Sequence, residues 1–195
     1  MMNDEVLLSV AAQNLQTAGA LVSRLGLFEL WRSAGAEPQF VGSVRTGLLM
    51  NHLDIDLHVY SERVDVEQDF KLMGRLAANP DVVAMHFRNG LQTEEQCLEW
   101  HCQVLNGNEI WSVDMIHIVK GSRYDGYFEE VADRLCAVLT PEMRKSILRL
   151  KYEVGSSIPG IVFCQAVVRD GIRTRNELDD WLKKISLHGI MDWMP

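Results

Sequence analysis

The stretch VGSVRTGLLMNHLDIDLHVYS, residues 41–61, decides the fold class of this chain. Its second half alternates apolar with polar side chains, in the order Leu53, Asp54, Ile55, Asp56, Leu57, His58, Val59 and Tyr60. A period of two predicts a β-strand with one polar face. Asp54 and Asp56 therefore point to the same side of that strand. Two adjacent hard oxygen ligands suit Mg²⁺, although an exposed strand face also often carries alternating acids.

Gly42 and Ser43 precede these aspartates by about ten residues. A Gly-Ser pair that ends a short strand and opens a helical turn exposes backbone N–H groups and a hydroxyl, which together can bind an anion. We expect this turn and the aspartates to lie at neighbouring strand ends, so that a phosphate at the turn can reach a metal at the carboxylates. The simpler interpretation is that Gly42 only permits a tight turn.

The rest of the amino-terminal part predicts a mixture of helices and strands. Helical spacing runs from about Asp4 to Ala34, with a break expected near Gly19, and again from Val66 to Ala78. The further strand candidates are PQFVGS at 38–43, Val82–Phe87, Cys97–Val104 and Ile110–Val119. Asn106-Gly107-Asn108 between the last two is a strong hairpin signal.

The carboxyl-terminal part predicts only helices, at about 126–139, 141–154, 158–170 and 175–187. Thr140 and Thr174 stand at N-cap positions, and Pro141 stands in a first turn. The predicted fold class is therefore α+β, with a mixed sheet and flanking helices over residues 1–121 and an all-helical region over residues 122–195.

Composition restricts the function. The chain has 195 residues, 47% of them apolar, which is enough for an ordinary core without disulfides. The 19 basic and 27 acidic residues leave a net charge of −8, which argues against binding of extended nucleic acid. The four cysteines form no C-x-x-C pair, and we see no apolar run of the roughly 20 residues that a membrane span needs. We therefore expect a cytoplasmic protein with no membrane partner.

The run hydrophobic-Gly-Ser, ten residues, Asp-hydrophobic-Asp-hydrophobic resembles the signature of the nucleotidyltransferase superfamily typified by DNA polymerase beta. That superfamily includes the small antibiotic and the minimal nucleotidyltransferases and the poly(A) polymerases. Gly42, Ser43, Asp54 and Asp56 match the pattern, which covers about 20 of the 195 residues. The resemblance implies a third carboxylate on a later strand. Asp114 in WSVDMIHIV is the candidate, and Glu99 is a weaker substitute.

The resemblance also implies the chemistry. Asp54, Asp56 and Asp114 would be the catalytic residues and would hold two Mg²⁺ ions. Gly42 and Ser43 would bind the β- and γ-phosphates of a nucleoside triphosphate such as ATP, and Arg45 would face the triphosphate. A nucleoside monophosphate would pass to a hydroxyl of a small molecule or of a protein.

Several points stay open at this level. A glutamate such as Glu129 or Glu130 can serve as base for the acceptor hydroxyl in the antibiotic enzymes, but a solvated helix face explains both residues as well. Sugar-nucleotide glycosyltransferases also use D-x-D, yet they need a larger nucleotide-binding domain before the motif. The alternative class is a protein that binds nucleotide or a partner without turnover, or a purely structural protein. A homodimer is compatible with the carboxyl-terminal helices.

Overall fold

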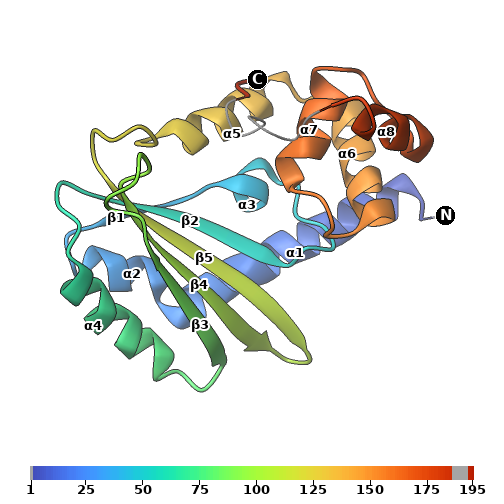
Figure 1. Ribbon diagram of the computed structural model, residues 1–195. Helices are drawn as coiled ribbons and strands as arrows, with labels where there is room; N and C mark the ends of the chain where they lie inside the picture. Colours follow the sequence, from blue (N-terminus) through green and yellow to red (C-terminus); the bar gives the residue numbers. More distant parts are fainter. Residues whose placement is uncertain (1, 186–192) are drawn as a thin grey trace.

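The computed structural model describes residues 2–185 and 193–195 of the chain. Its first part contains α1 (Asp4–Leu25), α2 (Leu27–Arg32), β1 (Glu37–Phe40), α3 (Gly42–Thr46), β2 (Asp54–Ser61), α4 (Val66–Ala77), β3 (Val82–Asn89), β4 (Cys97–Asn106) and β5 (Glu109–Val119). The second part contains α5 (Tyr127–Val138), α6 (Pro141–Val154), α7 (Gly160–Val168) and α8 (Arg175–Leu182) (Figure 1). The predicted α+β class is confirmed.

The strands form one five-stranded sheet in the order β1-β2-β5-β4-β3. β2 and β5 are parallel, and the other neighbours are antiparallel, so the sheet is mixed. The hairpin at Asn106-Gly107-Asn108 joins β4 to β5, as its turn residues predict. β2 and β5, which carry the candidate carboxylates, are therefore direct neighbours at the centre of the sheet.

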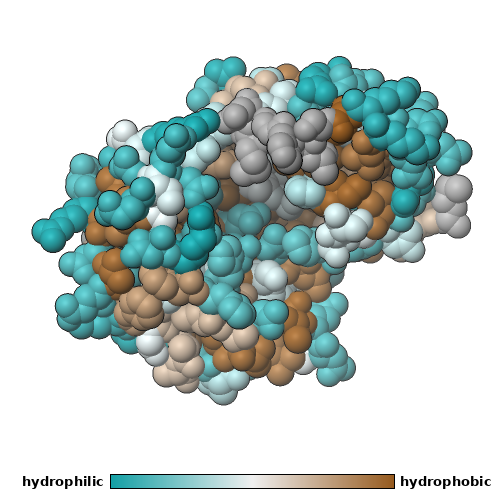
Figure 2. All heavy atoms as spheres, viewed as in Figure 1, coloured by the Kyte–Doolittle hydropathy of each residue, from teal (hydrophilic) through white to brown (hydrophobic). Residues whose placement is uncertain are grey.

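Helices α1, α2 and α4 lie against one face of the sheet, while α5–α8 stand on the other side of it (Figure 1). Figure 2 shows the surface hollowed between the sheet and the carboxyl-terminal helices. The two faces of each central strand consequently have different environments: one lies in a packed core, and the other lines a cavity.

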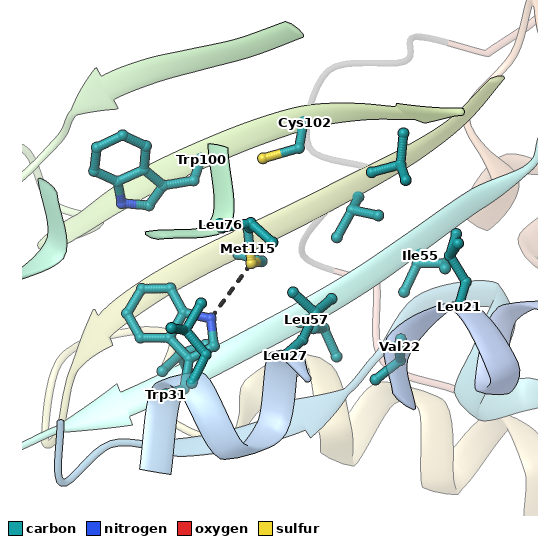
Figure 3. Packing of buried hydrophobic residues seen from close by; sticks show 14 of the residues in the cluster. Leu21, Val22, Leu27, Trp31, Ile55, Leu57, Leu76, Trp100, Cys102 and Met115 are labelled. Atoms are coloured by element: carbon teal, nitrogen blue, oxygen red, sulfur yellow. Dashed lines mark hydrogen bonds between the residues drawn. The ribbon is translucent and has the colours of Figure 1, made fainter. Parts of the chain in front are cut away.

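The core face holds the odd-numbered residues of β2 and β5. Ile55 and Leu57 pack against α1 and α2, and the indole Nε1 of Trp31 donates a hydrogen bond to Sδ of Met115 at 3.3 Å (Figure 3). Burial of these large apolar side chains contributes the main driving force for closing this layer. The alternation of apolar and polar residues over 53–60 thus predicts correctly which side chains of β2 enter the core and which face the cavity.

The helix α1 belongs to both hydrophobic clusters. Its first half places Leu7 and Ala11 among the carboxyl-terminal helices, and its second half places Leu21 and Val22 under the sheet. With 22 residues it is also long and apolar enough to pass as a membrane span by length and composition, but its buried side chains pack inside the two clusters. The division at residue 121 stays a prediction.

Two predicted helix boundaries are wrong. The amino-terminal helix breaks at Gly26, where a left-handed φ of 61° ends α1, and not at Gly19, which lies inside the helix. The last helix ends at Leu182 and not at residue 187; residues 186–187 of that prediction lie outside the described residues. In both cases the apolar spacing continues past the point where the backbone leaves the helix.

Candidate active site

The three predicted carboxylates come together on the cavity face. The parallel register sets Asp56 of β2 opposite Asp114 of β5, with Asp54 one step earlier on the same face. One oxygen atom from each of Asp54, Asp56 and Asp114 lies within 4.8 Å of the others. Three carboxylate oxygens at this spacing can share a divalent cation.

The electrostatics of this group fit a cation. Burial and the neighbouring Asp114 raise the pKa of Asp54 to about 6, and burial together with Asp54 and Asp114 raises the pKa of Asp56 well above its usual range. Among the described residues, the buried Oδ1 of Asp54 has no hydrogen-bond partner. A buried oxygen without a partner carries a desolvation cost that a bound cation would remove.

Residue 42, where β1 passes into α3, has to be a glycine. Its φ is +58°, and a Cβ there would overlap Oδ2 of Asp56. Both facts exclude an ordinary side chain, since a Cβ is strained at this φ and has no room. The turn therefore lies directly against the carboxylates, and Gly42, Ser43, Asp54 and Asp56 all line one cavity, as the spacing predicts.

Sequence reasoning missed Lys151. It lies on α6, and its Nζ donates to Oγ of Ser43 and to the carbonyl of Leu48, both at 2.8 Å. Burial lowers its pKa. No carboxylate of the described residues lies within ion-pair distance of this amine. The segment KSILRLKYEV gives no signal for it, because only tertiary packing brings residue 151 to residue 43.

The amino terminus of α7 completes this end of the cavity. Its N-cap, Pro159, makes no side-chain cap hydrogen bond, and a Cβ at Gly160 would stand 3.2 Å from Nζ of Lys151. Helix amino termini carry partial positive charge and unpaired N–H groups. Ser43, Lys151 and this helix end thus present donors to the same space, which is the composition of an anion site.

Arg45 does not belong to this group. Its guanidinium forms two hydrogen bonds with Asp133 of α5, at 2.7 and 2.8 Å, and one with the carbonyl of Phe40. This pairing raises the pKa of Arg45, and the side chain is absent from the described lining of the cavity. The geometry places the guanidinium of Arg45 on an acid 88 positions later in the chain, and a role for Arg45 at a triphosphate stays a prediction.

The remaining candidate acids have partners of their own. Tyr60 donates its hydroxyl to both oxygens of Glu129, at 2.8 and 2.7 Å, and burial raises the pKa of Glu129. Glu130 pairs with Arg134 on the helix surface. Glu99 lines the cavity but pairs with Arg88, which lowers its pKa. Asp114 is the candidate whose carboxylate oxygen lies within 4.8 Å of those of Asp54 and Asp56.

The cavity itself has a volume of about 790 Å³. That size is within the range of pockets for small molecules and cofactors. Its floor is the cavity face of β2, β5 and β4, with the carboxylates at one level and Ile116 and Ile118 beyond them. Side chains of α5 and α7 form apolar walls, among them Phe128, Leu135 and Phe163.

No family model matches this sequence, and no curated protein matches it. Solved structures do. Cid1, an RNA terminal uridylyl transferase, matches with a TM-score of 0.55 at 14% identity, over 84% of this chain and 51% of Cid1. The non-canonical poly(A) polymerase complex GLD-2–GLD-3 gives a TM-score of 0.60 at 11% identity, over 100% of this chain and 68% of the matched one. A cytoplasmic RNA terminal U-transferase gives 0.55 at 12%, over 84% and 52%.

This chain therefore has the nucleotidyltransferase fold, as the Gly-Ser and D-x-D pattern predicts. It spans about half the length of the Cid1 structure that it matches. At these identities the likeness concerns the fold, so the reaction, acceptor and partners of this chain have to be argued from its own residues.

Proposed function

We propose that this chain is a Mg²⁺-dependent nucleotidyltransferase that moves a nucleoside monophosphate from a nucleoside triphosphate to a hydroxyl of a small molecule. A protein hydroxyl is the second acceptor class. The observation that carries the proposal is the meeting of Asp54, Asp56 and Asp114 within 4.8 Å in the cavity that Gly42 and Ser43 also line. A purely structural sheet has no need of three mutually repelling carboxylates on one half-buried face.

The acidic group supplies the cation site. Its three hard oxygen donors, the unpartnered Oδ1 of Asp54 and the raised pKa of Asp54 all fit Mg²⁺. Two such ions, when bound, stabilise charge on the attacking and leaving oxygens of a phosphoryl transfer. Asp54, Asp56 and Asp114 would hold these ions.

The donor group would bind the phosphates. Ser43, Lys151 and the amino terminus of α7 lie on the β1–β2 side of the carboxylates and present hydroxyl, ammonium and N–H donors. An ammonium without a carboxylate partner is suited to neutralise the charge of the departing pyrophosphate. Lys151 takes the role that the family resemblance assigned to Arg45.

The acceptor side follows from in-line displacement. The attacking and leaving oxygens lie on opposite sides of the phosphorus. If pyrophosphate leaves toward Ser43 on the β1–β2 side, the hydroxyl approaches from the side of β5 and β4, where Asp114 lies. The net charge of −8 supports a small acceptor in preference to extended RNA, although the matched structures are RNA-modifying enzymes.

The test is calorimetric titration of ATP, GTP, CTP and UTP in the presence and absence of Mg²⁺. We expect at least one triphosphate to bind, and only with Mg²⁺, and the double substitution Asp54→Asn/Asp56→Asn to abolish binding. Asp179→Asn/Asp180→Asn is the matched control, because it removes two acids of α8 that do not line the cavity. The control is expected to bind like the natural sequence.

The acceptor is then sought by pyrophosphate release with the triphosphate that binds. A panel of small hydroxyl compounds is compared with a short RNA oligonucleotide and a hydroxyl-rich peptide. Release with the small compounds supports the proposal, and release with RNA alone replaces it by a tailing activity. Failure of all four triphosphates to bind would overturn the enzyme assignment.

A further inference from the structure

Of the three carboxylates, Asp114 is the one that a short side-chain hydrogen bond from another described residue holds. Nδ1 of His101 lies 2.9 Å from Oδ1 of Asp114. The two residues face each other directly in the antiparallel register of β4 and β5, so the sheet itself fixes their approach. Within the described part of the chain, Asp54 has the looser contact of its Oδ2 with the exposed His52, at 3.5 Å.

The other ring nitrogen of His101 also has a carboxylate partner. This Nε2 lies 3.3 Å from Oε2 of Glu99, two residues earlier on β4. Glu99 in turn accepts a hydrogen bond from Arg88, its direct neighbour on β3. Four side chains on three adjacent strands thus form a chain of alternating acids and bases that runs from the edge of the sheet to the carboxylate group.

This arrangement limits what Asp114 can do with its two oxygens. A ring nitrogen that faces a carboxylate oxygen bonds by donating, so Nδ1–H of His101 occupies Oδ1 of Asp114. The other oxygen is left for a cation that Asp114 would share with Asp54 and Asp56. Metal-binding carboxylates in proteins are commonly oriented by hydrogen bonds of this kind, and loss of the outer partner weakens metal binding about 10–100-fold.

We propose that His101 is a positioning residue of the cation site, which fixes the carboxylate of Asp114 and is kept in place by Glu99 and Arg88. The inference rests on the proposed function, because it assumes that the three carboxylates bind a divalent cation. It adds that this side of the site is rigid before the cation arrives. In this role His101 acts through the carboxylate of Asp114.

The position of His101 predicts a selective effect. Ser43 and Lys151 lie on the β1–β2 side of the carboxylates, whereas His101 lies on β4, on the far side of Asp114. Loss of His101 should therefore weaken the binding of the cation that contacts Asp114 and leave the phosphate-binding donors unchanged. A general loss of structure would weaken both.

The experiment measures Mn²⁺ binding by electron paramagnetic resonance and, separately, ATP binding at saturating Mn²⁺. The variants are His101→Leu, which removes both hydrogen bonds, and His101→Gln, which keeps a donor. His86→Leu is the control, since His86 is the exposed neighbour of His101 on β3. We expect His101→Leu to raise the Mn²⁺ dissociation constant about 10–100-fold, with partial recovery in His101→Gln and no change in His86→Leu.

ATP affinity at saturating Mn²⁺ is expected to stay within about threefold in His101→Leu, as long as the donor group is intact. Natural Mn²⁺ affinity in His101→Leu would overturn the positioning role while leaving the proposed function standing. Equal losses of Mn²⁺ and ATP affinity would also overturn it, because they indicate a structural effect. Absence of Mn²⁺ binding by the natural sequence would refute both proposals together.

Discussion

Two carboxylate–imidazole pairs lie on opposite faces of the same sheet. On the cavity face, His101 contacts Asp114, with side chains 42% and 29% exposed. On the core face, His117 contacts Asp69 of α4 at 2.9 Å, with side chains 5% and 1% exposed. The chemical groups are the same and the distances are equal, so the surroundings decide what each pair does.

The polar groups of the core pair, His117 and Asp69, form further hydrogen bonds inside the protein. Asp69 also accepts a hydrogen bond from Nε1 of Trp100, and Nε2 of His117 bonds Oγ of Ser61 at 2.8 Å. The ring of Trp31 packs edge-on against His117 with centroids 5.0 Å apart. Every polar group of this network has a partner, so it fastens α4 to β2, β4 and β5. The cavity pair, in contrast, adjoins the carboxylates of Asp54 and Asp56, whose negative charge a bound cation would neutralise.

The largest effect is expected at the cavity face. Asp114→Asn should lower the rate of pyrophosphate release at least about 1000-fold, because a metal-binding carboxylate is lost. The same change should not destabilise the metal-free protein, since burial and then repulsion by Asp114 raise the pKa of Asp54. The measurements are pyrophosphate release and urea unfolding in EDTA. A rate within tenfold of the natural sequence would contradict the role of Asp114.

On the core face, the corresponding loss should be one of stability. His117→Leu leaves the Asp69 carboxylate buried with Trp100 as its remaining side-chain donor among the described residues. Breaking a buried pair in this way costs about 3–5 kcal/mol. Urea unfolding should show this loss, and Mn²⁺ affinity of the folded variant should be unchanged. The matched His101→Leu variant should lose less than about 1 kcal/mol, as is typical of exposed pairs; equal losses would erase the distinction between the faces.

A third histidine, His58, is buried without a carboxylate beside its ring, so it shows the effect of burial on a histidine pKa. His58 is 7% exposed, contacts the Tyr60 hydroxyl at 3.3 Å and packs edge-on against Phe128. Burial lowers its pKa from 6.5 to about 4. The unfolded chain therefore binds the proton more strongly, and stability is lost as the pH falls from 6.5 toward 4, by up to about 1.4 kcal/mol per pH unit.

The measurement is urea unfolding of the natural protein and of His58→Phe at pH 7, 6 and 5. Phenylalanine keeps the ring against Phe128 and removes the titrating nitrogens. The difference in unfolding free energy between the two proteins should shift in favour of the variant as the pH falls. A constant difference over this range would show that His58 does not titrate with a lowered pKa.

The sequence predicted those features of the site that depend on local geometry. Alternation placed Asp54 and Asp56 on one face, and the same rule placed Asp114 with Ser112 and Ile116 on a later strand. The glycine at residue 42 follows from a turn that only a glycine can make so close to Asp56. The element types along residues 54–119 follow from the same local patterns.

The parts that sequence could not provide depend on contacts between distant segments. Lys151 reaches Ser43 across 108 positions, and Asp133 pairs with Arg45 across 88. Neither pairing leaves a periodic trace, because each is decided by how α5 and α6 pack against α3. The end of α1 at Gly26, and not at Gly19, is a similar case. Either glycine suits a C-cap, and packing decides which of the two ends the helix.

The smallest expected effect concerns Arg45. Its pair with Asp133 is partly open to solvent, with side chains 27% and 61% exposed, so Arg45→Ala should cost at most about 1 kcal/mol of stability. Because the guanidinium is engaged away from the cavity, nucleotide affinity should change less than about threefold, while Lys151→Met should weaken it at least about tenfold. Asp133→Asn frees Arg45 without removing it and is the matched control. Equal losses in Arg45→Ala and Lys151→Met, with Asp133→Asn unaffected, would return Arg45 to the phosphate site and make its pair with Asp133 a contact that nucleotide binding breaks.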